Sequence, residues 1–201
     1  MTAVLPFDRV RHEAARAPSR IRATAAGIAL SSAASGLLAA TTWLSWPDPA
    51  GVALADLGRM LLGLALLGTV LLVVHTGATK LGSGPAVRLP VLAAPALLVA
   101  AVGAHLIGGE VDGYTVVDIA FALTLLLVAG LALLTLEARL WARPARWILI
   151  LCQAWPVAVI PIGHFIGPNN GRLALEIWLA TGLFVFAAMA LARPAWFAGS
   201  R

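Results

Sequence analysis

Apolar residues occur in six long runs along this chain, separated by short polar or glycine-bearing segments. Each run is close to the ~20 residues that a helix needs to cross a hydrocarbon core about 30 Å thick. The pattern therefore predicts an all-α integral membrane protein with six transmembrane helices. The runs lie roughly at residues 24–46, 52–78, 88–108, 114–136, 146–167 and 172–192.

Only short connections join these runs, which leaves no room for a separate soluble domain. We expect a basic cytoplasmic segment at 1–23, one six-helix domain at 24–192 and a short cytoplasmic tail at 193–201. The first run exceeds the about 7 to 15 apolar residues of a cleaved signal peptide, so it is interpreted as a retained helix. The segment before it either anchors the topology or lies on the membrane surface as an amphipathic helix that Pro18 interrupts.

One short pattern recurs three times, with copies starting about 60 residues apart. Each copy has a tryptophan or histidine, then a glycine, then an acid five residues after the glycine. A fixed period of this kind indicates a repeated structural unit, here a two-helix hairpin. The copies are Trp43, Gly51 and Asp56; His105, Gly113 and Asp118; and His164, Gly171 and Glu176.

Composition and charge agree with a membrane protein. Hydrophobic residues make up 61% of the chain and charged residues only 11%, against about 25% charged in soluble domains. Apart from Arg59 and Arg172, the basic residues lie at the chain ends and in alternate connections. The positive-inside rule then places both termini in the cytoplasm of a multi-pass protein, most simply in a bacterial cytoplasmic membrane. The net charge of +5 therefore favours anionic lipids as partners rather than nucleic acid.

The predicted topology places the three repeated acids in the outer parts of their spans. Carboxylates inside a membrane are costly and usually face a bundle interior, which makes Asp56, Asp118 and Glu176 candidates for a substrate or ion site. Helix capping and the macrodipole offer a simpler explanation, because acids are favoured near helix N-termini. Asp56 fits that explanation least, and Arg59, three residues later, is expected to pair with it.

Two histidines of the repeat allow a second interpretation. His105 and His164 at equal depth would ligate a single haem b or a divalent metal, or would simply be polar rings at the membrane interface. Any haem would be non-covalent, because the chain has no CxxCH motif. His75 lies toward the cytoplasmic end of its span and is a separate candidate for proton relay or ligation.

Paired prolines occur in two spans, Pro90 with Pro95 and Pro156 with Pro161. Proline removes a helical hydrogen bond, and broken helices often form midplane substrate sites in transporters. Trp155 and Gln153 lie beside the second pair, so we expect this span to line a cavity. A kink that serves packing alone explains the prolines equally well.

The residues leave three functional classes. Metalloprotease, serine hydrolase, Walker A and dinucleotide-binding motifs are absent from the sequence. A proton- or cation-coupled transporter of small solutes accounts best for the acids. A membrane redox or metal-binding protein would use the histidines, and a membrane-embedded enzyme would act on a lipid or isoprenoid by acid and base chemistry. Helix faces with small residues at every fourth position also permit a homo-oligomer.

Overall fold

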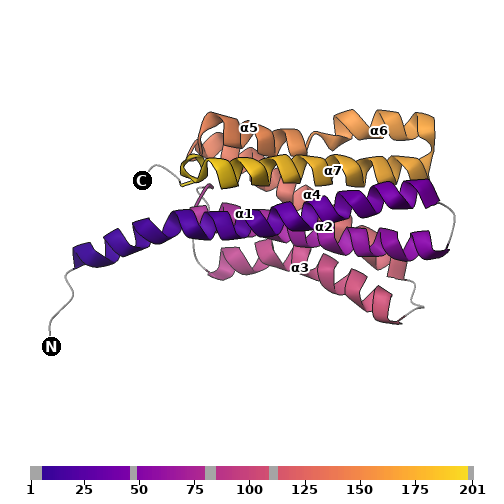
Figure 1. The fold of residues 1–201 in the computed structure, drawn as a ribbon, viewed down its shortest axis with the longest axis horizontal. Helices are drawn as coiled ribbons and strands as arrows, with labels where there is room; N and C mark the ends of the chain where they lie inside the picture. Colours follow the sequence, from indigo (N-terminus) through magenta and orange to yellow (C-terminus); the bar gives the residue numbers. More distant parts are fainter. Residues whose placement is uncertain (1–5, 46–48, 80–84, 109–112, 199–201) are drawn as a thin grey trace.

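The computed structural model describes residues 6–45, 49–79, 85–108 and 113–198, and these are helical throughout apart from short connections. Figure 1 shows the helices running roughly side by side in one elongated bundle. The elements are α1 (Pro6–Ser45), α2 (Pro49–Thr76), α3 (Pro85–Gly108), α4 (Gly113–Ala138), α5 (Arg143–Cys152), α6 (Trp155–Ile166), α7 (Pro168–Ala192) and a 3₁₀ turn η1 (Pro194–Trp196).

Five segments of the described chain are long and apolar enough to cross a membrane, which supports a multi-pass membrane protein. A sixth segment, Val91–Ala104 in α3, is apolar but shorter. It falls within the predicted run at 88–108. The five longer segments are Pro18–Trp43, Leu54–Thr76, Val117–Ala138, Arg143–Pro161 and Asn170–Ala192.

Helix α1 does not stop at Pro18, contrary to the expectation from the sequence. It is a single helix of 40 residues with Pro18 in its interior, and at 1.5 Å per residue it is about 60 Å long. Its first part projects beyond the other helices (Figure 1). Outside the bundle, water can solvate the carbonyl group that proline leaves without a donor, so the helix tolerates the residue.

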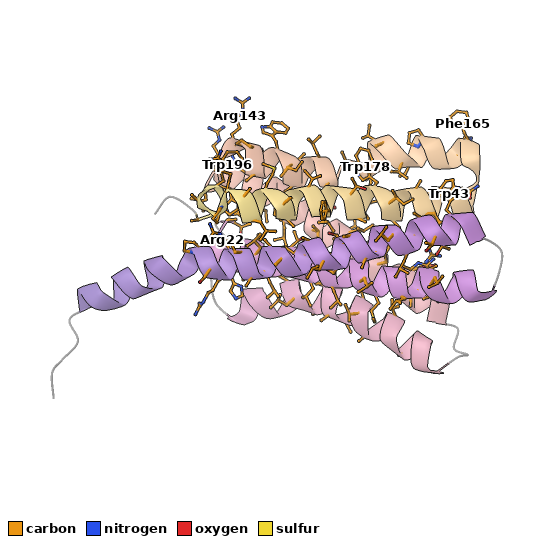
Figure 2. All side chains as sticks on the ribbon, in the orientation of Figure 1. Arg22, Trp43, Arg143, Phe165, Trp178 and Trp196 are labelled. Carbon is orange, nitrogen blue, oxygen red and sulfur yellow. The ribbon has the colours of Figure 1, made fainter. Side chains whose placement is uncertain are left out.

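The last residues of α1, α3 and α6 and the first residues of α2, α4 and α7 lie at the same end of the bundle, which we call the hairpin end (Figure 1). The start of α1 and the turn η1 lie at the opposite end. Figure 2 shows Trp43 and Phe165 near the hairpin end and Arg22 and Arg143 toward the opposite end. The three copies of the sequence pattern are thus brought to one end of the molecule.

The span predicted at 146–167 is broken into two helices. The backbone N–H groups of Gln153 and Ala154 donate to Ile150 and Leu151, at 2.9 and 3.1 Å, and these i to i−3 bonds close α5. Helix α6 begins at Trp155, followed by Pro156, a residue suited to a first helical turn because it has no N–H to satisfy. By contrast, α3 continues as one helix through its own proline pair.

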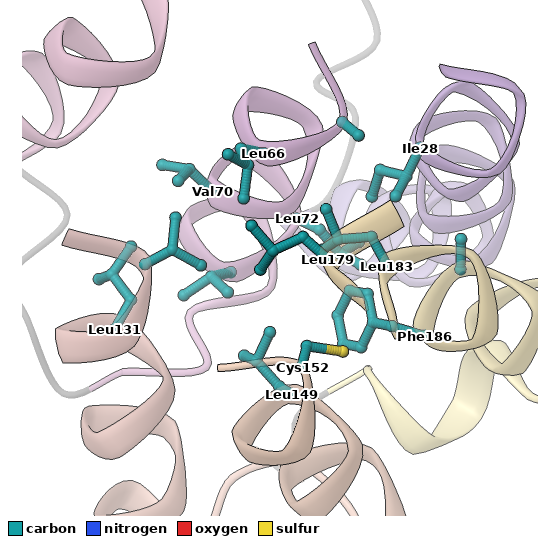
Figure 3. Packing of buried hydrophobic residues seen from close by; sticks show 14 of the residues in the cluster. Ile28, Leu66, Val70, Leu72, Leu131, Leu149, Cys152, Leu179, Leu183 and Phe186 are labelled. Carbon is teal, nitrogen blue, oxygen red and sulfur yellow. The ribbon is translucent and has the colours of Figure 1, made fainter. Parts of the chain in front are cut away.

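Close helix contacts through glycine hold the core together. A Cβ atom at Gly68 in α2 would lie 2.7 Å from Ile28 of α1. At Gly182 in α7 it would lie 2.9 Å from Cys152 Sγ and 3.2 Å from the Cys152 Cα atom at the end of α5. Figure 3 shows Cys152 among buried side chains that include Leu149 and Phe186. The end of α5 is therefore pressed directly against α7.

Gly182→Ala is expected to destabilise the protein by about 1–3 kcal/mol, because the new methyl group meets backbone that cannot rotate away. Thermal unfolding in detergent micelles measures the loss. Gly130→Ala in α4 is the matched control: nothing lies within 4 Å of a Cβ atom there, and alanine is the better helix former. Equal stability of the two variants would contradict the tight contact between α5 and α7.

Candidate functional site

A buried arginine joins two of the three repeated acids. Arg59 in α2 donates from Nη1 to Asp56 Oδ1 at 2.6 Å and from Nε to Glu176 Oε1 at 2.8 Å. The exposed fractions of Asp56, Arg59 and Glu176 are 3%, 7% and 1%. The pairing of Asp56 with Arg59 expected from their spacing is present, and Glu176 joins it from a helix far along the chain.

The third repeated acid is connected through a second arginine. Arg172 in α7 donates from Nη2 to Asp118 Oδ1 in α4. Its Nε atom lies 3.9 Å from Glu176 Oε1, so the same oxygen that accepts from Arg59 also faces Arg172. Asp118, Arg172, Glu176, Arg59 and Asp56 therefore form one chain of alternating charge, which we call the ion network.

The ion network runs from an exposed end to a buried end. The side chain of Asp118 is 50% exposed and that of Arg172 is 32% exposed, whereas Glu176 and Asp56 are almost completely enclosed. Guanidinium groups suit this position because they carry several donors and are always charged. The buried carboxylates are compensated by hydrogen-bonded partners, as charges in a low-dielectric interior must be.

Local helix geometry explains why these side chains meet. Asp56 lies seven residues after the start of α2 at Pro49, about two turns in, so it is beyond the first turn where an acid would cap the helix. Arg59 is three residues after Asp56, and Glu176 is four residues after Arg172. Both spacings put a pair on one helix face. Three helices, α2, α4 and α7, then bring these faces together at the hairpin end.

Asp118 is better explained by its partner than by a helix cap. It lies five residues after Gly113, where α4 begins, and its carboxylate accepts a hydrogen bond from Arg172 of α7. The contact therefore links two helices, α4 and α7, that are distant in sequence. An exposed pair of this kind contributes only about 0–1 kcal/mol to stability.

Arg59 and Arg172, the two arginines of the ion network, are also the two basic residues that lie outside the predicted cytoplasmic segments of the sequence. Arg59 was predicted as a partner of Asp56, whereas Arg172 was not recognised as a site residue. Its position held a usable signal, because a basic residue on the otherwise acidic side of the topology needs a local partner. Glu176, four residues after it, is that kind of partner.

Where side chains are described, the ion pairs of the network involve neither a histidine nor a residue of the helix break. His164 and His75 have exposed side chains, and the His164 ring is 5.9 Å from the ring of Phe165. His105 belongs to α3, but its side chain lies outside the described residues. Among the described side chains, no group of three or more histidine, cysteine, aspartate and glutamate residues is placed to hold a metal ion. Gln153 and Trp155 flank the break between α5 and α6.

Comparison of the chain with protein-family models, curated proteins and solved structures finds no match.

Proposed function

We propose that the chain is a small-solute transporter coupled to protons or cations, with the ion network as its coupling site. In this proposal six transmembrane helices form three hairpin units, both termini are cytoplasmic, and the protein resides in the cytoplasmic membrane of a bacterium. The observation that carries the proposal is the position of Glu176. Its carboxylate is 1% exposed and lies between Arg59, on the buried side, and Arg172, on the exposed side.

The charge balance of the ion network supports coupling to one positive charge. Counted over its described members, three carboxylates and two guanidinium groups, the ion network carries a net charge of −1 when every group is ionised. One proton, or one monovalent cation, neutralises the set. A charged group inside a membrane is costly unless it is compensated. The neutral state of the network is therefore more stable when enclosed by apolar side chains, and the charged state is more stable when water reaches it.

The contacts also provide a mechanical consequence of protonation. Ionised Glu176 holds Arg59 at 2.8 Å and thereby ties α7 to α2. A proton on Glu176 removes the attraction between the two charges, and Arg59 retains Asp56 on its own helix at 2.6 Å. The link between α2 and α7 then weakens, whereas the pair within α2 persists. Such a two-state contact lets one bound proton bias the arrangement of two helices.

Solute-evoked proton entry into liposomes tests this function. The purified chain is reconstituted with a pH-sensitive dye inside, and a panel of amino acids, sugars, small carboxylates and organic cations is added under an imposed inward proton gradient. We expect at least one solute class to accelerate proton entry relative to protein-free liposomes. A parallel sodium gradient at equal pH tests the cation alternative. If no class moves either ion, the transport proposal is wrong.

A further inference from the structure

Unsatisfied polar atoms are concentrated at the break between α5 and α6. Four buried side-chain nitrogen or oxygen atoms have no hydrogen-bond partner among the described residues, and three of them belong to Gln153 and Trp155. They are Nε2 and Oε1 of Gln153 and Nε1 of Trp155. Buried polar groups are nearly always paired, and an unpaired one loses its hydration without compensation. Three such atoms within three residues indicate a site that another molecule completes.

The packing around the break shows from which side a ligand can approach. On the α7 side, Cys152 is pressed against Gly182 and leaves no room. Helix α6 packs chiefly on α7, and its side chains Val157 and Ile160, which lie within a candidate membrane span, are 82% and 57% exposed. In a membrane-spanning segment such an apolar face borders lipid chains. Leu151 and Val157, on either side of the break, are 54% and 82% exposed, so this apolar surface is the side from which a membrane molecule can reach the break.

The three atoms specify the chemistry of the ligand. The amide of Gln153 offers N–H donors and one carbonyl acceptor, and the Trp155 indole offers one donor. A hydroxyl group complements this set, because it donates to Oε1 and accepts from Nε2 or Nε1. A charged ligand group would enter a low-dielectric region without a counter-charge from these uncharged side chains. The ligand group is therefore neutral.

We propose that the break between α5 and α6 binds the hydroxyl group of an uncharged molecule, which reaches Gln153 and Trp155 from the surrounding membrane. The site is separate from the ion network, since Gly182 follows Glu176 by six residues, about 9 Å along α7. Binding at this site does not depend on proton coupling, so it can be measured without an ion gradient. A water-soluble polyol carries the same hydroxyl group, so the experiment compares a membrane alcohol with a polyol.

Thermal unfolding in lipid nanodiscs tests this site with two probes, 1-hexadecanol for the membrane and glycerol for the aqueous phase. Hexadecanol at ~100-fold above its dissociation constant is expected to raise the unfolding midpoint of the wild-type chain by roughly 5 °C or more. Gln153→Leu and Trp155→Phe are expected to abolish this shift. Trp178→Phe, which changes a partly exposed tryptophan on the neighbouring helix α7, is the matched control and should retain it.

Stability without ligand provides the second readout. Gln153→Leu removes two unpaired atoms, so this variant is expected to unfold at or above the wild-type midpoint when no probe is present. A Gln153-dependent shift with glycerol alone supports the same site with a water-soluble ligand. The inference is overturned if neither probe shifts the wild-type midpoint. It is also overturned if Gln153→Leu and Trp155→Phe respond to the probes like the wild type, or if both destabilise the ligand-free chain more than Trp178→Phe.

Discussion

Arg59→Leu is expected to lower the unfolding free energy by about 3–5 kcal/mol, the loss typical of breaking a buried ion pair by removing one partner. Arg59 joins Asp56 to Glu176 in the described structure, at 2.6 and 2.8 Å. Without it, the enclosed carboxylates of Asp56 and Glu176 lose the guanidinium group that they share. Titration of the protein in mixed micelles with a denaturing detergent, at neutral pH, measures the change.

A compensated variant separates the charge from the shape of the side chain. Adding Asp56→Asn and Glu176→Gln to Arg59→Leu removes the charges of both carboxylates that Arg59 pairs, so most of the lost stability should return. Arg172→Leu is the second control, and its effect should be smaller because that guanidinium is 32% exposed and exposed pairs contribute about 0–1 kcal/mol. If Arg59→Leu and Arg172→Leu cost the same, the buried part of the ion network does not stabilise the fold as described.

Glu176→Gln is expected to reduce solute-evoked proton entry to the level of protein-free liposomes. Glutamine preserves the size of the side chain and its capacity to accept a hydrogen bond from Arg59, but it cannot take up or release a proton. The variant should therefore fold and still bind solute. Exchange of solute across the membrane without a proton gradient is expected to continue, whereas uptake driven by the gradient is lost.

Asp118→Asn serves as the matched control for this experiment, because it changes a carboxylate of the same ion network at its exposed end. Its carboxylate accepts a hydrogen bond from Arg172 in the described part of the chain. An exposed pair worth at most about 1 kcal/mol corresponds to less than about a fivefold change in rate. If Asp118→Asn abolishes coupling and Glu176→Gln does not, the coupling carboxylate lies at the exposed end.

The sequence predicts the helical class well because apolar run length responds directly to membrane thickness. The run at 52–78 corresponds to α2, Pro49–Thr76, and the run at 172–192 to α7, Pro168–Ala192. The sequence pattern did not predict which of the two proline pairs interrupts its helix. Only the span with Pro156 is broken in the structure, since whether a helix stays continuous at a proline depends on what satisfies the freed carbonyl group.

The candidate site was partly predictable for a similar reason. Contacts within one helix follow from residue spacing, so the pair Asp56 and Arg59 could be read from the sequence. The sequence pattern predicted that the three acids lie in the outer parts of their spans, and the two arginines connect all three in the structure. The approach of Glu176 to Arg59 could not be predicted, because it depends on how α2 and α7 are rotated about their own axes. The pairing of Arg172 with Asp118 could not be predicted either, because it depends on how α4 and α7 are rotated.

The central claim is that Glu176 carries the proton that drives transport, and proton entry through wild-type and Glu176→Gln chains tests it most directly. Both are reconstituted at equal protein content and exposed to the same solute and the same inward proton gradient. We predict that the solute accelerates proton entry through the wild type and has no effect on the variant. Equal solute-evoked proton entry through both chains would contradict the account.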